Sequence, residues 1–300
     1  MGDLLTIALR FALYLDLTLL FGLALFSLYG LGSAQDRWRF RRPLAMTVVL
    51  GVLLSGGALL QLALSMSGAA SLAELDPTLL PMLVLETAVG QSWLLRLASL
   101  LLAGLALVGR DRFSLYGLIL GATTALASLA WTGHGAMDDG ARRYLHLGND
   151  ILHLLGSGVW LGALAAFALL LRNSALSGER QTRDLLAALK GFASLGALVV
   201  VALGLSGVLN YLLIVGPDLT PLSGSTYGLL LGLKVAVFAL MLVFAALNRF
   251  HLVPQLEQAQ QDSPGVAVAA LRRSMILELL AALLILGLVA ALGILSPAQP

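Results

Sequence analysis

The chain has 300 residues, of which 59% are hydrophobic and 11% charged, whereas soluble globular domains carry about 25% charged residues. Together with a mean hydropathy of +0.94, this composition excludes a soluble domain and indicates an integral membrane protein. The net charge of +2 does not indicate a nucleic-acid partner, and the absence of cysteine excludes disulfides, thiolate metal sites and iron–sulfur clusters.

Long apolar segments predict the membrane spans, since a spanning helix needs roughly 20 mainly apolar residues. Between polar breaks, such segments cover about residues 4–31, 44–67, 79–108, 113–132, 144–171, 186–215, 226–249 and 271–295. No basic leader or cleavage pattern marks the first segment as a signal peptide, so we expect it to be retained. The sequence therefore predicts an all-α polytopic membrane protein with eight transmembrane helices in one domain, residues 1–300.

Arginines in the short loops predict the orientation of these helices. The loops after the first, third, fifth and seventh segments carry Arg37, Arg39, Arg41, Arg42, Arg110, Arg112, Arg172, Arg180, Arg183, Arg249, Arg272 and Arg273. The loops on the opposite side carry only Arg142 and Arg143. Because cytoplasmic loops hold the excess of Lys and Arg, we expect both termini to be extracytoplasmic.

Two segments favour an internal repeat. "VVLGVLLSGGALLQ" (48–61) in the second span is similar to "VVVALGLSGVLN" (199–210) in the sixth. Both spans run in the same direction, so the repeat would be a parallel four-plus-four arrangement with halves 1–132 and 133–300. Chance is the alternative, because Leu, Gly and Ser are common in membrane helices.

Polar side chains inside the spans form a second pattern, because such groups are costly in lipid and usually pair or line a pathway. At a rise of about 1.5 Å per residue, five of them fall in one layer below the extracytoplasmic helix ends, and Arg96 lies deeper. The five are Arg10, Glu86, Asp150, Asn210 and Lys234. They form either ion pairs that pin the bundle, with some side chains reaching the interface, or a polar vestibule that opens outward.

Three of the four histidines lie within 20 residues of one another, at the fifth span and the loop before it. His146, Asp150 and His153 are spaced i, i+4 and i+7, which places them on one helix face, and His134 and Met137 precede them. Imidazole suits copper and zinc, thioether selects Cu(I), and carboxylate can help to hold Cu(II). The pattern predicts a metal site, with interfacial hydrogen bonding by each histidine as the alternative.

Six segments, in order from the third to the eighth span, resemble the bacterial copper-resistance membrane protein D family (CopD). They are "TAVGQSWLLR" (87–96), "GHGAM" (133–137), "NDILHLLGSGVWLGAL" (149–164), "TYGLLLGLK" (226–234), "LNRFHLVP" (247–254) and "LRRSMILEL" (271–279). The first 80 residues match the family only in character. "GHGAM" also differs from the Gly-His-Ala-Ala that is common in the family.

The resemblance implies a protein of the bacterial cytoplasmic (inner) membrane that moves copper ions inward, often beside a periplasmic CopC-like copper carrier. It implies His134 and His153 as copper ligands, with Asp150 beside His153. His146 and Met137 are not implied by the resemblance and rest on spacing alone. Besides copper, the expected partners are membrane lipid and a separate CopC-like carrier, with no nucleic acid.

The sequence thus predicts a copper transporter or permease rather than an enzyme. It contains no P-loop and no Asp-Lys-Thr-Gly phosphorylation motif, so we expect that ATP does not drive it directly. Two alternatives stay open: a membrane copper chaperone or assembly factor without transport, and a haem b redox protein. The haem alternative needs two histidines on different helices at matching depth.

Overall fold

The computed structural model describes residues 2–32, 36–69, 71–133, 139–173, 179–217, 222, 224–259 and 265–295. These residues form helices and no strand. Eight of the helices are long and apolar enough to cross a membrane, which confirms the predicted fold class.

The elements follow one another as a series of long helices with short helical connections. In chain order they are α1 (Gly2–Tyr29), η1 (Asp36–Trp38), α2 (Arg41–Ser67), η2 (Leu72–Glu74), α3 (Leu79–Glu86), α4 (Ala88–Ala106), α5 (Arg112–Ala127), η3 (Ser128–Thr132), α6 (Gly140–Asn173), α7 (Glu179–Ile214), α8 (Thr226–Leu247), η6 (Asn248–Leu252), α9 (Val253–Gln258) and α10 (Gly265–Leu292).

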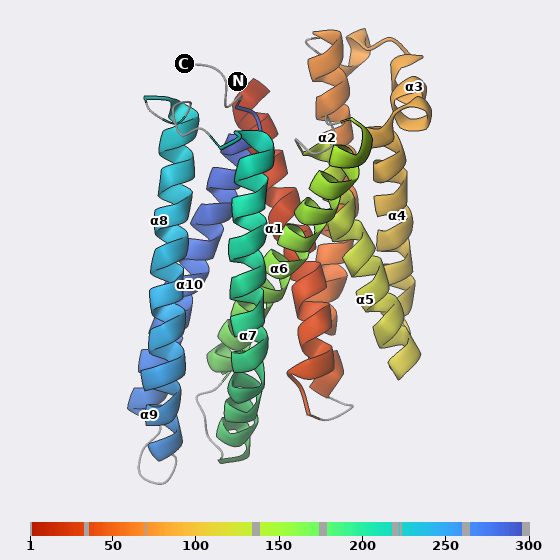
Figure 1. The fold of residues 1–300 in the computed structure, drawn as a ribbon. Helices are drawn as coiled ribbons and strands as arrows, with labels where there is room; N and C mark the ends of the chain where they lie inside the picture. Colours follow the sequence, from red (N-terminus) through yellow and green to blue (C-terminus); the bar gives the residue numbers. More distant parts are fainter. Residues whose placement is uncertain are drawn as a thin grey trace.

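Helices α1 and α6 lie in the middle of the bundle and join its two sides (Figure 1). On one side α1 contacts α2 and α5, and on the other α6 contacts α7 and α10, while the two central helices contact each other. The beginning of α1 and the end of α10 lie at the same end of the molecule, where the Arg10 guanidinium lies against Gly293. We call this the terminal end; the opposite, basic end carries the loops in which most arginines lie.

Glycines allow the backbones of α1 and α6 to touch. A Cβ atom on Gly22 would overlap the backbone of Gly158 and Gly162, and a Cβ atom on Gly162 would overlap the backbone of Gly22. Small residues let membrane helices approach closely enough for extensive van der Waals contact. This crossing fixes α6 at the centre of the bundle.

The expected third span, 79–108, is broken in the structure. Thr87 is extended (φ −109°, ψ 148°), and its Oγ1 accepts a hydrogen bond from the Gly90 backbone N–H at 3.0 Å, as the N-cap of a new helix does. The chain therefore forms the short helix α3 and then the spanning helix α4. The expectation that Glu86 lies inside a spanning helix is wrong, because it is an exposed residue at the end of α3.

Part of the segment between the expected spans 226–249 and 271–295 is helical. Helix α8 continues through a π-helical turn, η6, directly into α9, so that this span ends at Gln258. π turns are rare and often occur at functional sites. The turn places Asn248 and Arg249 at the basic end of the bundle.

The glycine crossing predicts that Gly162→Ala destabilises the protein. The added methyl group would overlap the Gly22 backbone, and overpacking a close contact costs about 1–3 kcal/mol. The free energy of unfolding, measured by denaturant titration of the purified protein in detergent, should fall by that amount.

Gly232→Ala in α8 is the matched control, because a Cβ atom there would meet no atom within 4 Å. The control should leave the unfolding free energy unchanged or raise it slightly, since alanine is the better helix former. Equal losses in the two variants would contradict the role of the crossing.

Candidate metal-handling site

The predicted stripe on α6 is present at the terminal end of the bundle. His146 is 2% exposed, and its Nε2 lies 3.9 Å from Oδ2 of Asp150, four residues later. His153 follows one turn deeper on the same face and faces α7. The structure therefore brings three of the five predicted metal ligands together, while their binding of metal stays a prediction.

Ser206 of α7 orients the ring of His153. The His153 Nδ1 lies 2.8 Å from Ser206 Oγ, and the same hydroxyl donates its proton to the Ala202 carbonyl at 2.6 Å. Because a serine has one hydroxyl proton, we assign Nδ1 as the protonated nitrogen that donates to Ser206. The other nitrogen, Nε2, then carries the lone pair that a metal ion requires.

A second contact between α6 and α7 lies one turn closer to the terminal end. Asn149 is 7% exposed, and its Nδ2 donates to the Ser206 carbonyl at 2.9 Å and to Asn210 Oδ1 at 2.7 Å. Asn210, predicted as part of the polar layer, therefore pairs with Asn149. These bonds fix the α6 stripe relative to α7.

Lys234 of α8 completes the polar group. It interacts electrostatically with both Asp150 and His153, so three helices converge on the stripe. Asp150 therefore lies between a histidine of its own helix and a lysine of a neighbouring one. A cation that binds here must share the Asp150 carboxylate with Lys234 or displace its ammonium group.

The other predicted charges lie elsewhere. Arg96 is 2% exposed in α4, and its Nε donates to Ser128 Oγ at 2.8 Å on the α5 side of the bundle. Arg10 lies against the end of α10. Glu86 is exposed and lies outside the spans. The expected single layer therefore divides into a group around Asp150, which includes Asn210 and Lys234, and residues that lie apart from this group.

Two predicted ligands, His134 and Met137, lie outside the described residues. Gly133, the last described residue before them, is beside Asp150: a Cβ atom on Gly133 would lie 3.6 Å from Asp150 Oδ2. Among the residues that the structure describes, no group of three or more His, Cys, Asp or Glu side chains could hold a metal ion. The stripe therefore needs further donors to form a complete coordination shell.

Sequence reasoning missed Asn149 and Ser206. Asn149 stands next to the predicted Asp150, and Ser206 precedes Asn210 by four residues, one helical turn. That spacing indicated that Ser206 shares a helix face with Asn210. It did not indicate which helix this face contacts.

Comparison with known proteins agrees with the copper-related resemblance. Residues 1–144 match the family model "Copper resistance protein D-like, N-terminal domain", and residues 186–292 match "Copper resistance protein D". No solved structure is significantly similar.

Three relatives have similar sequences. A "Copper resistance protein D" of Pseudomonas syringae pv. tomato is 46% identical over 99% of this chain and 98% of its own. "Inner membrane protein YebZ" of Escherichia coli K12 is 29% identical over 84% of this chain and 86% of its own. "Copper transport protein CutJ" of Bacillus subtilis 168 is 28% identical over 81% of this chain but only 46% of its own. This chain therefore belongs to the copper resistance protein D family.

Proposed function

We propose that this protein carries copper ions across the bacterial inner membrane, from the periplasm toward the cytoplasm. The ions enter at a site made by His134, His146, Asp150, His153 and Met137. The observation that carries the proposal is His153 itself, whose Nδ1 is held by Ser206 and whose Nε2 is free to bind metal in the assigned tautomer. The names of the relatives support copper as the cargo.

The donor set fits copper better than magnesium or calcium. Imidazole and thioether suit copper, whereas magnesium and calcium prefer oxygen donors only. Ser206 accepts the hydrogen bond that usually orients a ligating histidine. In this proposal His134 and Met137 supply the donors that the described residues lack, from the segment that begins next to Asp150.

The distribution of arginines supports an extracytoplasmic position for the terminal end. A copper ion would then arrive from the periplasm, and a CopC-like carrier is the proposed donor. The driving force would come from the copper gradient, from protons or from the membrane potential. The protein acts in this proposal as a transporter and not as an enzyme.

The described histidines do not favour the haem alternative. His146 and His153 stand on the same helix, and His251 is exposed at the basic end. Axial ligation by two histidines across a haem needs them on facing helices. A Soret band in the purified protein would revive this alternative.

His153→Ala should lower the amount of copper that the purified protein binds at this site and its copper uptake into proteoliposomes, each by at least about tenfold. The reason is the loss of the ligand that Ser206 orients. His251→Ala removes an exposed histidine far from the site and serves as the matched control with wild-type binding and uptake. Combining His134→Ala with His153→Ala should abolish copper binding at this site.

The outcomes of this experiment separate the candidate functions. Equal copper in wild type and the double variant would contradict the site assignment. Stoichiometric copper binding without any uptake by the wild type would leave the chaperone alternative in place of transport.

Ser206→Ala should weaken copper binding about tenfold, as loss of a hydrogen bond to a metal ligand usually does, because the His153 ring loses the group that orients it. Ser99→Ala is the matched control: Ser99 is also buried, and its Oγ donates to its own helix at Leu95 O. Competition with a chromophoric copper chelator measures both affinities. Indistinguishable affinities in the two variants would contradict the role of Ser206.

A further inference from the structure

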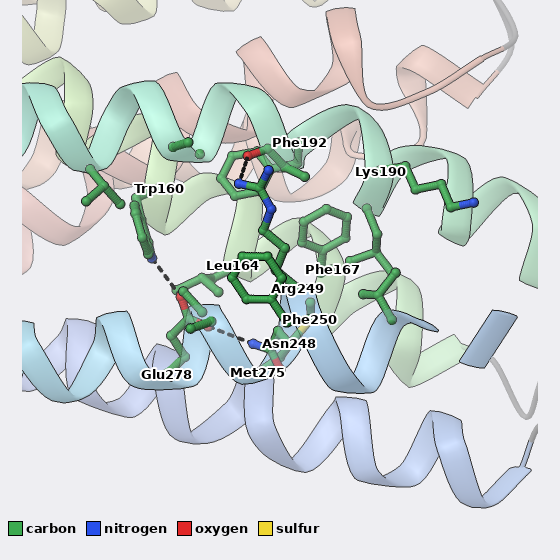
Figure 2. A pocket seen from close by; sticks show the side chains of 18 of the residues that line it. Trp160, Leu164, Phe167, Lys190, Phe192, Asn248, Arg249, Phe250, Met275 and Glu278 are labelled. Carbon is green, nitrogen blue, oxygen red and sulfur yellow. Dashed lines mark hydrogen bonds between the residues drawn. The ribbon is translucent and has the colours of Figure 1, made fainter. Parts of the chain in front are cut away.

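A cavity of about 580 Å³ lies toward the basic end of the bundle, between α6, α7, α8 and α10. Its walls are mostly apolar, and Trp160, Leu164 and Phe167 of α6 form part of them (Figure 2). At its base the Glu278 carboxylate lies between Trp160 and Asn248. The metal-handling site described above does not include any of these residues.

Glu278 is a buried carboxylate held only by neutral groups. It is 3% exposed, and its two oxygens accept hydrogen bonds from Trp160 Nε1 and Asn248 Nδ2, each at 2.9 Å. Within the described ranges no arginine, lysine or histidine forms a salt bridge with it. An ionised carboxylate buried without a counter-charge is costly in a membrane protein, and a bound cation would offset that cost.

Two further donor atoms lie beside this carboxylate. Asn248 is 6% exposed, and its Oδ1 has no hydrogen-bond partner among the residues that the structure describes. Met275 lines the same cavity one turn before Glu278 on α10 and so shares its helix face. The base of the cavity therefore offers a carboxylate, an amide oxygen and a thioether.

The cations at the cavity have other partners. Lys190 pairs with Glu257 at 2.6 Å, where both side chains are about half exposed. Arg249 donates to the Ala193 carbonyl at 3.1 Å and so joins η6 to α7. Neither contact involves Glu278, so neither of these cations occupies its carboxylate.

One face of α6 connects the two regions. His146, Asp150, His153, Ser157 and Trp160 follow at intervals of three or four residues, the spacing of a single helix face. Trp160 lies about 10 Å further along the axis than His153, and its indole binds Glu278 directly. The histidine stripe and Trp160 at the wall of the cavity therefore share one face of α6.

We propose that Glu278, Asn248 and Met275 form a second copper site, at which the ion rests after leaving His153 and from which it departs at the basic end. This inference rests on the proposed transport of copper. Carboxylate, amide and thioether donors together suit a copper ion that is bound weakly enough to leave.

Trp160 supplies a local reporter of this site, because copper bound at Glu278 would quench the indole that bonds to it. Purified protein in detergent is titrated with Cu(I) under reducing conditions, and separately with Cu(II), while tryptophan fluorescence is recorded. At least one titration of the wild type should show a quenching phase that is absent in Trp160→Phe. Glu278→Gln and Met275→Leu should each shift that phase to at least about tenfold higher copper.

Glu257→Gln is the matched control, because Glu257 also lines the cavity but pairs with Lys190; its titration should match the wild type. Met275→Leu leaves both hydrogen bonds of Glu278 in place, so its effect separates ligand loss from misfolding. The same quenching phase, with unchanged midpoint and amplitude, in Trp160→Phe, or a wild-type phase in both Glu278→Gln and Met275→Leu, would overturn the second site.

Uptake into proteoliposomes separates this inference from the transport proposal. Glu278→Gln should retain copper at His153, and its uptake rate should be at least about tenfold lower than that of the wild type. Wild-type uptake by this variant would overturn the second site alone. Absence of uptake by the wild type would overturn transport, and the Trp160 titration would still decide whether Glu278 binds copper.

Discussion

The contact between the backbones of α1 and α6 is the constraint on which the rest of the bundle depends. Apolar side chains gain little by moving from lipid tails into a helix interface, so packing must supply the attraction between helices. Gly22, Gly158 and Gly162 allow that packing and fix α6 between the two sides of the molecule. The metal-handling stripe lies on α6, and Trp160 of α6 donates a hydrogen bond to Glu278 of the proposed second site, so the crossing also sets where these side chains lie.

Hydropathy predicted the number of spans because a helix in lipid must be apolar along its whole length. It did not detect the break at Thr87, since a hydrogen-bonded cap changes the backbone without changing the mean hydropathy. Glu86 was consequently placed too deep by counting residues along an unbroken helix. The π-helical turn after α8 was not predicted for a similar reason, because its sequence differs little from that of an ordinary helix end.

Spacing along one helix predicted that His146, Asp150 and His153 share a face, because the α-helical period is fixed. It could not predict Ser206 as their partner, since a period defines a face but not the neighbouring helix that it meets. Sequence spacing does not connect Glu278 with its partners, because Trp160 and Asn248 stand 118 and 30 residues away. Only the folded bundle reveals it as part of a network.

Lys234 has a kinetic consequence for any ion held beside it. Its side chain interacts with Asp150 and His153, so its protonated form would repel a cation at the ligands that attract one. A protonated Lys234 would shorten the residence time of the ion, and a neutral Lys234 would lengthen it. A storage protein would gain nothing from that arrangement, whereas a pathway needs sites that an ion can leave as readily as it enters.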